Sequence, residues 1–438
     1  MPIWIVSPRV FWANCCIVGP EVRFDAMRQT PCRKTRLCFI IDKLALRSGG
    51  AERVLIETAN ALYDHGYAVE IVTYEPRGKR PFYPLRKGII LSNIRPRDHN
   101  RSQVWRVMSR VRSMLHRNRF FIPGLSHLQW WSQNGSFRRR LAAHIDATAP
   151  DVAIAFLPPA VTALGHAHFS HQTRRFASLH NVPEQDFDNP GRWDPNPVDR
   201  KLRRAALAHF DGIGILLPEF RDWFDDELQE RLIVMPNAVH PVDPACLSAA
   251  KRKKRVISVG RLADVKQHRL LIEAWSHLKD DFPDWICEIY GVGPLESALK
   301  EQIEQLQLDE TVILRGATNA IEKEYLSAKI LAHPAEFEGF GLVITEALAH
   351  GLPVVGFEDC SGFNFIVHDQ VSGLFVSAAG DRAKNLSGSL AKLMRDPALC
   401  TALGDAGLKE IERFSPQSIL ALWEQAIQGT DQRLVLEA

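Results

Sequence analysis

The sequence lacks the features that mark several specialised classes of protein. No uninterrupted apolar run approaches the roughly 20 residues that a helix needs to cross a bilayer. The eight cysteines include no C-x-x-C pair, and no histidine lies at zinc-ligand spacing from a cysteine pair. The net charge is only +3, too small over 438 residues to indicate a dedicated nucleic-acid-binding protein. We therefore expect free thiols in a reducing compartment and no nucleic-acid partner.

The residues that are present fit a soluble globular protein. Hydrophobic residues make up 46% of the chain and charged residues 24%, which excludes a wholly disordered chain, a collagen-like fibre and a small disulfide-rich scaffold. Because one domain takes roughly 100–200 residues, the length predicts two domains, with three as an alternative. The apolar start of the chain is interrupted by Pro8 and Arg9 and follows no basic segment, so we do not expect a signal peptide.

The order of apolar runs predicts the domain organisation. Residues 1–35 are expected to be an N-terminal appendage and a candidate for disorder, with Met27 as an alternative start. From residue 36 onward, short apolar runs alternate with stretches of helical periodicity, which is typical of a parallel sheet covered on both faces. The proline-containing, basic stretch 238–254 interrupts this alternation, which predicts a linker or hinge, and the alternation resumes after it. Strands are expected at residues 37–41, 68–74, 152–156, 176–179, 212–217, 232–235, 256–259, 285–290, 312–314 and 330–333, and a further strand is expected to begin at Pro353 and the valines that follow it.

This pattern predicts an α/β fold of two doubly wound, Rossmann-like domains. We expect a first domain over residues 36–240 and a second over 241–415. Apolar residues at helical spacing near the end of the chain predict a helix over residues 416–438 that packs back on the first domain.

One stretch, residues 95–140, is strongly basic and is called the basic insertion below. It contains eleven arginines interleaved with aromatic residues, and Asp98 is its only acid. Each basic group near an anionic bilayer contributes about 1 kcal/mol of binding, and tryptophan and phenylalanine favour the interface. We expect the basic insertion to contact a membrane surface or an anionic lipid-linked substrate; a solvated insertion is the alternative. The aromatic residues concerned are Trp105, Phe120, Phe121, Trp130 and Trp131.

The strongest chemical signal lies at residues 334–355, where an expected strand leads through a glycine-containing loop into a helix. Gly339 and Gly341 let backbone N–H groups approach a ligand, and the helix that begins near Gly341 adds its positive dipole, so the place suits a diphosphate. Glu338 lies in this loop, and Glu346 follows eight residues later in an otherwise apolar helix. A carboxylate there is costly to bury unless it receives hydrogen bonds, for instance from ribose hydroxyls. An internal partner for Glu346 is the alternative.

This string resembles the E-x7-E signature of the retaining glycosyltransferases of family 4, and the resemblance covers about residues 36–430. It implies the glycosyltransferase-B fold, in which two Rossmann-like domains face a cleft. It also implies that Glu338 contacts the donor sugar and that Glu346 holds the nucleotide ribose. The backbone of Phe340, Gly341 and Leu342 would then hold donor hydroxyls and phosphate.

A second motif, Gly260-Arg261-Leu262 with Lys266, follows the strand expected at 256–259. Parallel sheets bind ligands at the carboxyl ends of their strands, where arginine gives bidentate contacts and lysine a point charge. The motif resembles the G-R-L-x-x-x-K pattern of the family, which implies that Arg261 and Lys266 neutralise the leaving nucleotide diphosphate. Two solvated surface cations are the alternative.

Further positions resemble the family more weakly. Gly49 and Gly50 open the first expected helix, like the glycine pair that faces the donor. His180 and Arg315 end expected strands, where the family places a sugar-binding histidine and the nucleobase, respectively. The candidate catalytic residues are Glu338, Arg261, Lys266 and His180. The candidate donor-binding residues are Gly49, Gly50, Gly260, Gly339, Phe340, Gly341, Leu342, Glu346 and Arg315.

We expect no metal site and no cofactor beyond the nucleotide-sugar co-substrate. Asp186-Phe187-Asp188 is nominally a D-x-D sequence, but it lies in a proline-flanked loop with no apolar strand before it. The histidines near residue 168 have no carboxylate at metal-site spacing.

The sequence therefore predicts a retaining, metal-independent glycosyltransferase of hexosyl or N-acetylhexosaminyl type. It would move a sugar from a nucleotide-sugar to an acceptor hydroxyl. Because of the basic insertion, we expect a lipid-linked glycan as acceptor and a cytoplasmic protein held peripherally on the inner membrane face. A non-catalytic subunit that binds a nucleotide-sugar or glycan is one alternative, and a transferase with a soluble acceptor on the same fold is another.

Overall fold

The computed structural model describes residues 34–47, 49–76, 78–96, 114, 121, 124–190 and 192–429. The appendage expected at residues 1–35 lies almost wholly outside this part of the chain, as does the centre of the basic insertion. No helix within the described residues is long and apolar enough to cross a membrane.

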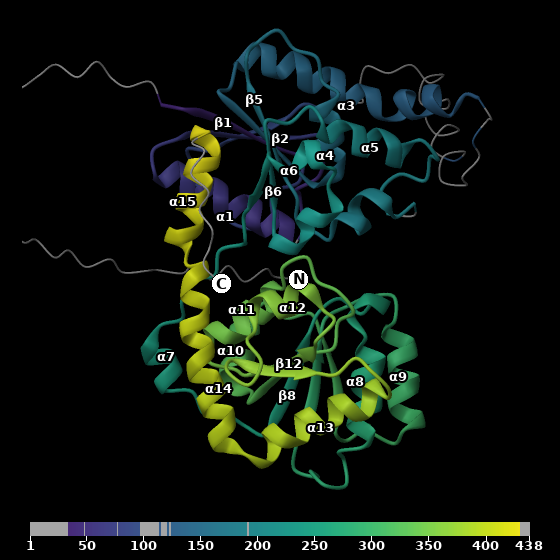
Figure 1. Cartoon of the computed structure of the whole chain (residues 1–438), viewed down its shortest axis with the longest axis vertical. Coiled ribbons are helices and arrows are strands. Elements are labelled where there is room, and N and C mark those ends of the chain that lie inside the picture. The colour runs from purple at the N-terminus through teal and green to yellow at the C-terminus, as the bar shows by residue number, and fades with distance from the viewer. Residues whose placement is uncertain are drawn as a thin grey trace, which may run out of the picture. The chain divides into compact units, whose positions relative to one another are not determined.

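In the described first half of the chain, seven parallel strands form one sheet in the order β3-β2-β1-β4-β5-β6-β7. Figure 1 labels β1, β2, β5 and β6 of this sheet. Alternate residues of β1 enter different apolar clusters, Cys38 and Ile40 on one face and Phe39 and Ile41 on the other. Both faces of the sheet are therefore covered, as an all-parallel sheet requires. The strands are β1 (Arg36–Ile41), β2 (Ala68–Thr73), β3 (Ile90–Asn93), β4 (Val152–Phe156), β5 (Arg174–Ser178), β6 (Gly212–Ile215) and β7 (Leu232–Val234).

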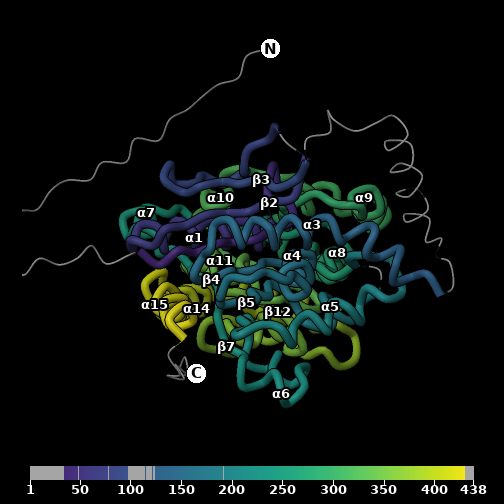
Figure 2. Tube along the Cα trace, turned by 90° about the horizontal axis from the view of Figure 1, so that it is seen from above, coloured from purple at the N-terminus to yellow at the C-terminus, as the bar shows by residue number. Residues whose placement is uncertain are grey.

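The helices between these strands are α1 (Gly50–Asp64), α3 (Ser126–Thr148), α4 (Leu157–Gly165), α5 (Asp199–Leu207) and α6 (Asp226–Gln229), with a π-helical turn η2 (Glu184–Asp188) and a 3-10 helix η3 (Pro218–Trp223). Helices α3 and α4 lie side by side (Figure 2).

In the second half, six parallel strands form a sheet in the order β10-β9-β8-β11-β12-β13. They are β8 (Arg255–Val259), β9 (Ile286–Tyr290), β10 (Val312–Gly316), β11 (Ile330–His333), β12 (Val354–Phe357) and β13 (Gly373–Val376). The associated helices are α7 (Pro244–Ser248), η4 (Asp264–Lys266), α8 (His268–Ser276), α9 (Glu296–Gln305), α10 (Ile321–Ser327), α11 (Leu342–Ala349), α12 (Ser361–Ile366), α13 (Arg382–Arg395), α14 (Pro397–Glu410) and η5 (Ile411–Phe414). The predicted fold class, two doubly wound parallel sheets, is confirmed.

The apolar pattern does not predict two edge strands, β3 and β13. In β3, Ile90 and Leu91 are exposed, so the strand lacks the continuous apolar run that marks a buried strand. In β13, only a short Gly373-Leu374-Phe375-Val376 run is present, and it pairs with β12 alone. The exposed apolar residues of β3 and the short apolar run of β13 explain why the pattern misses these two strands.

The last described helix, α15 (Pro416–Gln428), packs against helix α1 of the first domain (Figure 1). Its Trp423 is buried among aromatic rings of β1, β4 and β5, with ring centroids 6.3 Å from Phe39, 6.2 Å from Phe156 and 5.7 Å from Phe176. The chain therefore completes the first apolar core only after it has passed through the second sheet.

The described part of the basic insertion differs from the expectation of exposed aromatic residues. Trp130 is buried, and its Nε1 donates to Asp199 Oδ1 at 2.7 Å. Trp131 packs edge-on against His166, with Arg138 over its ring at 4.8 Å. The buried Trp130 therefore anchors α3 to α5 of its own domain and is not available to a membrane surface, whereas Trp131 is half-buried beside the end of α4. Most arginines of the basic insertion lie outside the described residues.

Candidate active site

The loop between β11 and α11 is built around glycines whose conformation or surroundings exclude a side chain. Gly341 caps α11 with a φ of +96°, the left-handed region that favours glycine. Gly362, in the first turn of α12, lies directly beneath the loop, since a Cβ there would come within 2.7 Å of Glu338 Cβ and 2.9 Å of the Phe340 carbonyl oxygen. The loop is thus held between the N-termini of α11 and α12, and this packing fixes the orientation of the Glu338 side chain.

Gly339 brings this loop against the first domain. A Cβ at this position would lie 2.9 Å from Asn181 Cα and 3.2 Å from the His180 carbonyl oxygen. These atoms follow directly after β5. The absence of a side chain therefore allows the backbones of the two domains to meet beside Glu338.

Glu338 is paired with a cation and a histidine. Lys266 Nζ donates to Glu338 Oε1, and His333 Nε2 lies 3.3 Å from the same oxygen. Burial opposes ionisation of Glu338, but the Lys266 ammonium and His333 outweigh it and lower the pKa of the carboxyl to about 2. Burial also lowers the pKa of His333, partly offset by Glu338. Glu338 is consequently an anion at neutral pH, held beside a lysine that can exchange partners.

The strand order explains this pairing. β8 and β11 are neighbours in the sheet, so the turn after β8 that carries Lys266 lies beside the loop after β11. The turn from Gly260 to Leu262 is itself packed by two glycines, because a Cβ at Gly291 would overlap the Gly260 carbonyl oxygen and one at Gly293 the Leu262 backbone. Arg261 is exposed and has no ion-pair partner among the described residues, so its guanidinium is available to a ligand.

Two histidines flank this cluster, the half-buried His180 and the buried His268. His180 stacks on Phe156 at a centroid distance of 4.6 Å, and its Nε2 lies 2.8 Å from Ser178 Oγ. Its Nδ1 is buried with no hydrogen-bond partner among the described residues. Burial lowers the pKa of His180 to about 3. Burial, and then Lys266 and His333, lower the pKa of His268 to about 4. Both rings are neutral at pH 7.

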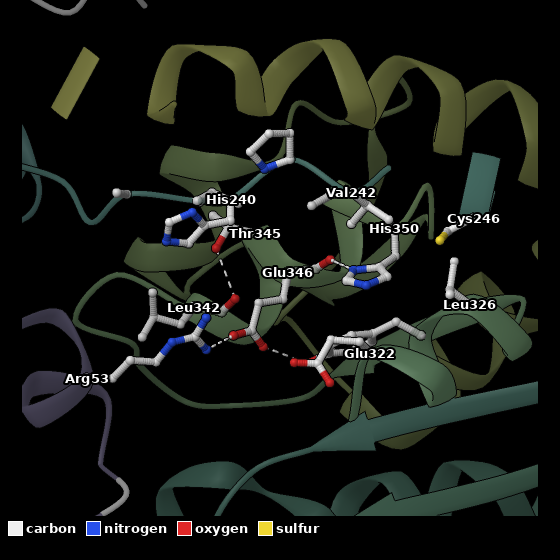
Figure 3. Close-up of a pocket in the computed structure, with 15 residues that line it drawn as sticks. Arg53, His240, Val242, Cys246, Glu322, Leu326, Leu342, Thr345, Glu346 and His350 are labelled. Carbon is white, nitrogen blue, oxygen red and sulfur yellow. Dashed lines mark hydrogen bonds and ion pairs between the residues drawn. The ribbon is translucent and has the colours of Figure 1, made fainter. Parts of the chain in front are cut away.

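Glu346 lies on α11 and takes part in a second polar cluster (Figure 3). Arg53 of α1 donates to Glu346 Oε1, and the Tyr325 hydroxyl of α10 donates to Glu346 Oε2 at 3.0 Å. Burial raises the pKa of Glu346, while Arg53 and Tyr325 act in the opposite direction. The carboxylate borders a cavity of about 280 Å³ that is lined by α1, the 238–242 segment, α7, α10 and α11. The two ideas for Glu346, an internal partner and a ribose ligand, are compatible because a carboxylate has more acceptor sites than these two donors use.

The remaining predicted residues are distributed around these clusters. Gly50 lies beside Leu342, since a Cβ there would come within 3.2 Å of Leu342 Cδ1, and Gly49 lies over the Glu52 carboxylate. Phe340 is buried and packs edge-on against Phe414. The Arg315 guanidinium is already held by Glu288, with Nε to Oε1 at 2.7 Å. A contact from Arg315 to a donor would therefore have to come from its backbone or displace this ion pair.

Three residues that contact Glu338 or Glu346 were not predicted from the sequence as site residues. His333 ends β11, and Tyr325 and Arg53 reach Glu346 from α10 and α1. The strand-end position of His333 and the place of Arg53 three residues after the glycine pair are signals that could have identified two of them. Nothing in the sequence marks Tyr325.

Asp186 and Asp188 lie in η2 and are used inside the first domain. The buried Asp186 accepts from Asn181 Nδ2 at 3.1 Å and Trp193 Nε1 at 3.2 Å. Asp188 accepts from Trp223 Nε1 at 2.7 Å. These contacts hold the segment that follows His180.

Two family models match consecutive parts of the chain. The model "Glycosyltransferase Family 4" matches residues 48–242, and the model "Glycosyl transferases group 1" matches residues 243–410. Their junction falls between the two sheets, so each model covers one of them.

Curated relatives match part of the chain. The poly(glycerol-phosphate) alpha-glucosyltransferase of Bacillus subtilis is 28% identical over 200 residues, which are 45% of this chain and 29% of the relative. The N-acetylgalactosamine-N,N'-diacetylbacillosaminyl-diphospho-undecaprenol 4-alpha-N-acetylgalactosaminyltransferase of Campylobacter jejuni is 34% identical over 170 residues, which are 39% of this chain and 45% of the relative. In both cases the match spans less than half of the relative's length.

Among solved structures, TarM of S. aureus, in complex with Fondaparinux, alpha-GlcNAc-glycerol and UDP, superposes with a TM-score of 0.69 at 14% identity. The likeness covers 90% of this chain and 99% of TarM and concerns the fold. The two family models, which together cover residues 48–410, show that the chain belongs to family 4 of the glycosyltransferases, and the likeness to TarM shows that it has the glycosyltransferase-B fold.

Proposed function

We propose that the protein transfers a sugar from a nucleotide-sugar to an acceptor hydroxyl with retention of the anomeric configuration. The observation that carries the proposal is the Glu338–Lys266 pair at the carboxyl ends of β8 and β11. The N-terminus of α11 lies beside it, and the exposed Arg261 has no ion-pair partner in the part of the chain that the structure describes. Such a place combines an anion for the sugar hydroxyls with cations and a helix dipole for a diphosphate.

The position of this site suggests which domain binds the donor and which binds the acceptor. We assign residues 241–415 to binding of the nucleotide-sugar and residues 36–240 to the acceptor side, joined near residue 240. We also assign residues 416–438 to the first domain, an assignment that the burial of Trp423 of α15 supports. Closure of the domains would exclude water and so suppress hydrolysis of the donor.

In the proposed reaction the bond between the anomeric carbon and the diphosphate oxygen breaks, and the acceptor oxygen bonds to that carbon on the same face. The acceptor proton passes to the departing diphosphate oxygen. Lys266 and Arg261 stabilise the charge that develops on the diphosphate. Glu338 is ionised and orients the sugar, and the neutral His180 offers a ring nitrogen to a sugar hydroxyl.

The donor and acceptor are proposed by similarity. TarM was solved with UDP, which favours a UDP-sugar, with hexosyl and N-acetylhexosaminyl groups as the two candidates. For the acceptor, the relative that acts on a diphospho-undecaprenol glycan favours a lipid-linked glycan in polysaccharide or glycolipid synthesis. The basic insertion would then hold the protein peripherally at the inner membrane face through the arginines between residues 97 and 119.

The test is a transfer assay with UDP-sugars and a membrane extract, read by product mass. Glu338→Gln and Lys266→Ala are each expected to lower kcat by about 10²-fold or more, since each removes a charge that acts on the transition state. Lys300→Ala is the matched control, because Lys300 makes an exposed ion pair with Glu296 on α9. Near-native turnover of both variants, in folded protein, would contradict the site. Binding of the nucleotide-sugar without transfer to any acceptor would instead favour a non-catalytic subunit.

A further inference from the structure

A chain of polar contacts connects the segment between the domains, the first domain and the second domain. His240 Nε2 lies 3.8 Å from Glu57 Oε2, and Arg53 Nε donates to Glu57 Oε1 at 2.8 Å. Arg53 Nη1 donates to Glu346 Oε1, and Tyr325 completes the chain. Arg53 comes from α1 and reaches across to α11 (Figure 3).

Arg53 is important because of the charges that line the cavity beside Glu346. Among the described residues that line it, Arg53 is the only arginine or lysine, whereas Glu322 and Glu346 are both acids. Tyr325 is buried and stays neutral, because burial and then Glu346 raise the pKa of its hydroxyl. The half-buried Glu346 carboxylate therefore takes its counter-charge from Arg53.

Arg53 is itself fixed in place. Its side chain is braced by Glu57 one helical turn along α1, so its guanidinium is held at both ends. Gly50 lies three residues before Arg53, in the first turn of α1. Because Gly50 has no side chain, this turn can pack against Leu342 at the start of α11. The position of Arg53 is thus set by backbone packing as well as by charge.

We propose that Arg53 is a positioning residue for the nucleoside end of the donor: it holds Glu346 in the orientation in which the ribose hydroxyls bind, so that α1 of the first domain takes part in donor recognition. This inference rests on the proposed function, in which Glu346 is the ribose ligand. A carboxylate has about four lone-pair sites, and Arg53 and Tyr325 use two of them. The two that remain suit the adjacent 2′- and 3′-hydroxyls of a ribose.

The test compares ribose with deoxyribose in wild-type and variant proteins. The affinity of the full chain is measured by calorimetry for the tightest binder among UDP, GDP and ADP and for its 2′-deoxy form. A hydrogen bond to a charged group contributes enough that the wild type should prefer the ribonucleotide by about tenfold. Arg53→Ala should reduce this preference to about twofold or less, and Arg53→Lys should restore part of it, because lysine retains the charge but lacks the fork geometry.

Glu346→Gln separates the inference from the proposed function. If Glu346→Gln leaves the ribose preference intact, Glu346 is not the ribose ligand and the proposed donor site is wrong. If Glu346→Gln abolishes the preference while Arg53→Ala retains it, only the role of Arg53 is overturned. Arg86→Ala is the control, since Arg86 makes an exposed ion pair with Asp64 at the other end of the same helix. The Arg86→Ala variant should prefer the ribonucleotide over its 2′-deoxy form as strongly as the wild type does.

Discussion

Glu338 shows how much of a residue's chemistry depends on its neighbours. Alone, a buried carboxyl would take up a proton, because burial disfavours the charged form. Here Lys266 and His333 reverse that tendency and bring the pKa to about 2. The same lysine is the residue that we assign to the diphosphate, so donor binding would exchange one anionic partner of Lys266 for another without leaving it unpaired.

The neutral histidines give a prediction for stability against pH. The pKa values of His180, about 3, and His268, about 4, lie below the value of about 6.5 expected in the unfolded chain. Above pH 6.5 neither state binds these protons, and the full stability is present. As the pH falls below 6.5, the unfolded state is protonated first, so each histidine lowers the free energy of unfolding by about 1.4 kcal/mol per pH unit.

The measurement is the urea and thermal unfolding midpoint between pH 7 and pH 5. His268→Gln should show a shallower fall than the wild type, because one of the histidines whose pKa folding lowers is gone. Equal slopes for the two proteins would mean that His268 is not buried as a neutral ring.

At the scale of the element, the β11–α11 loop must approach the first domain without a side chain. Gly339→Ala would place a methyl group 2.9 Å from Asn181 Cα, so it should move the loop that carries Glu338. A displacement of this kind can cost about 10²-fold in rate, and we expect a loss of that order in kcat. The variant is compared with wild type in the transfer assay and by thermal unfolding.

Gly388→Ala is the matched control for the same substitution. Gly388 lies exposed on α13, and an added Cβ meets nothing within 4 Å. It should leave kcat unchanged and stabilise the protein by about 0.5–1 kcal/mol, since alanine favours a helix interior. A Gly339→Ala enzyme with native kcat would show that the two backbones do not need to meet during catalysis.

For the whole molecule, α15 ties the end of the chain into the first core. Trp423 is buried against three aromatic rings of the first sheet, so Trp423→Ala should lower the free energy of unfolding by about 3–5 kcal/mol. Gln417→Ala, at an exposed position of the same helix, should change it little. Unfolding midpoints that coincide for both variants would be inconsistent with the observed packing of α15.

The continuity of the core is also a property of the whole molecule. One apolar cluster contains Leu179 and Phe187 of the first domain as well as Phe340 and Phe363 of the second. Together with the Arg53–Glu346 ion pair, it makes the contact between the domains both apolar and charged.

Local patterns in the sequence were sufficient to predict two parallel α/β sheets, because buried strands and amphipathic helices leave a periodic trace in consecutive residues. The glycine loop and the two acids at 338 and 346 could be recognised for the same reason: their spacing is local. Edge strand β3 and the burial of Trp130 could not, since neither depends on neighbouring residues alone. Arg53 and Glu346 lie 293 positions apart, and only the folding of α1 onto α11 makes them partners. Contacts of that separation are decided by how the elements pack in space.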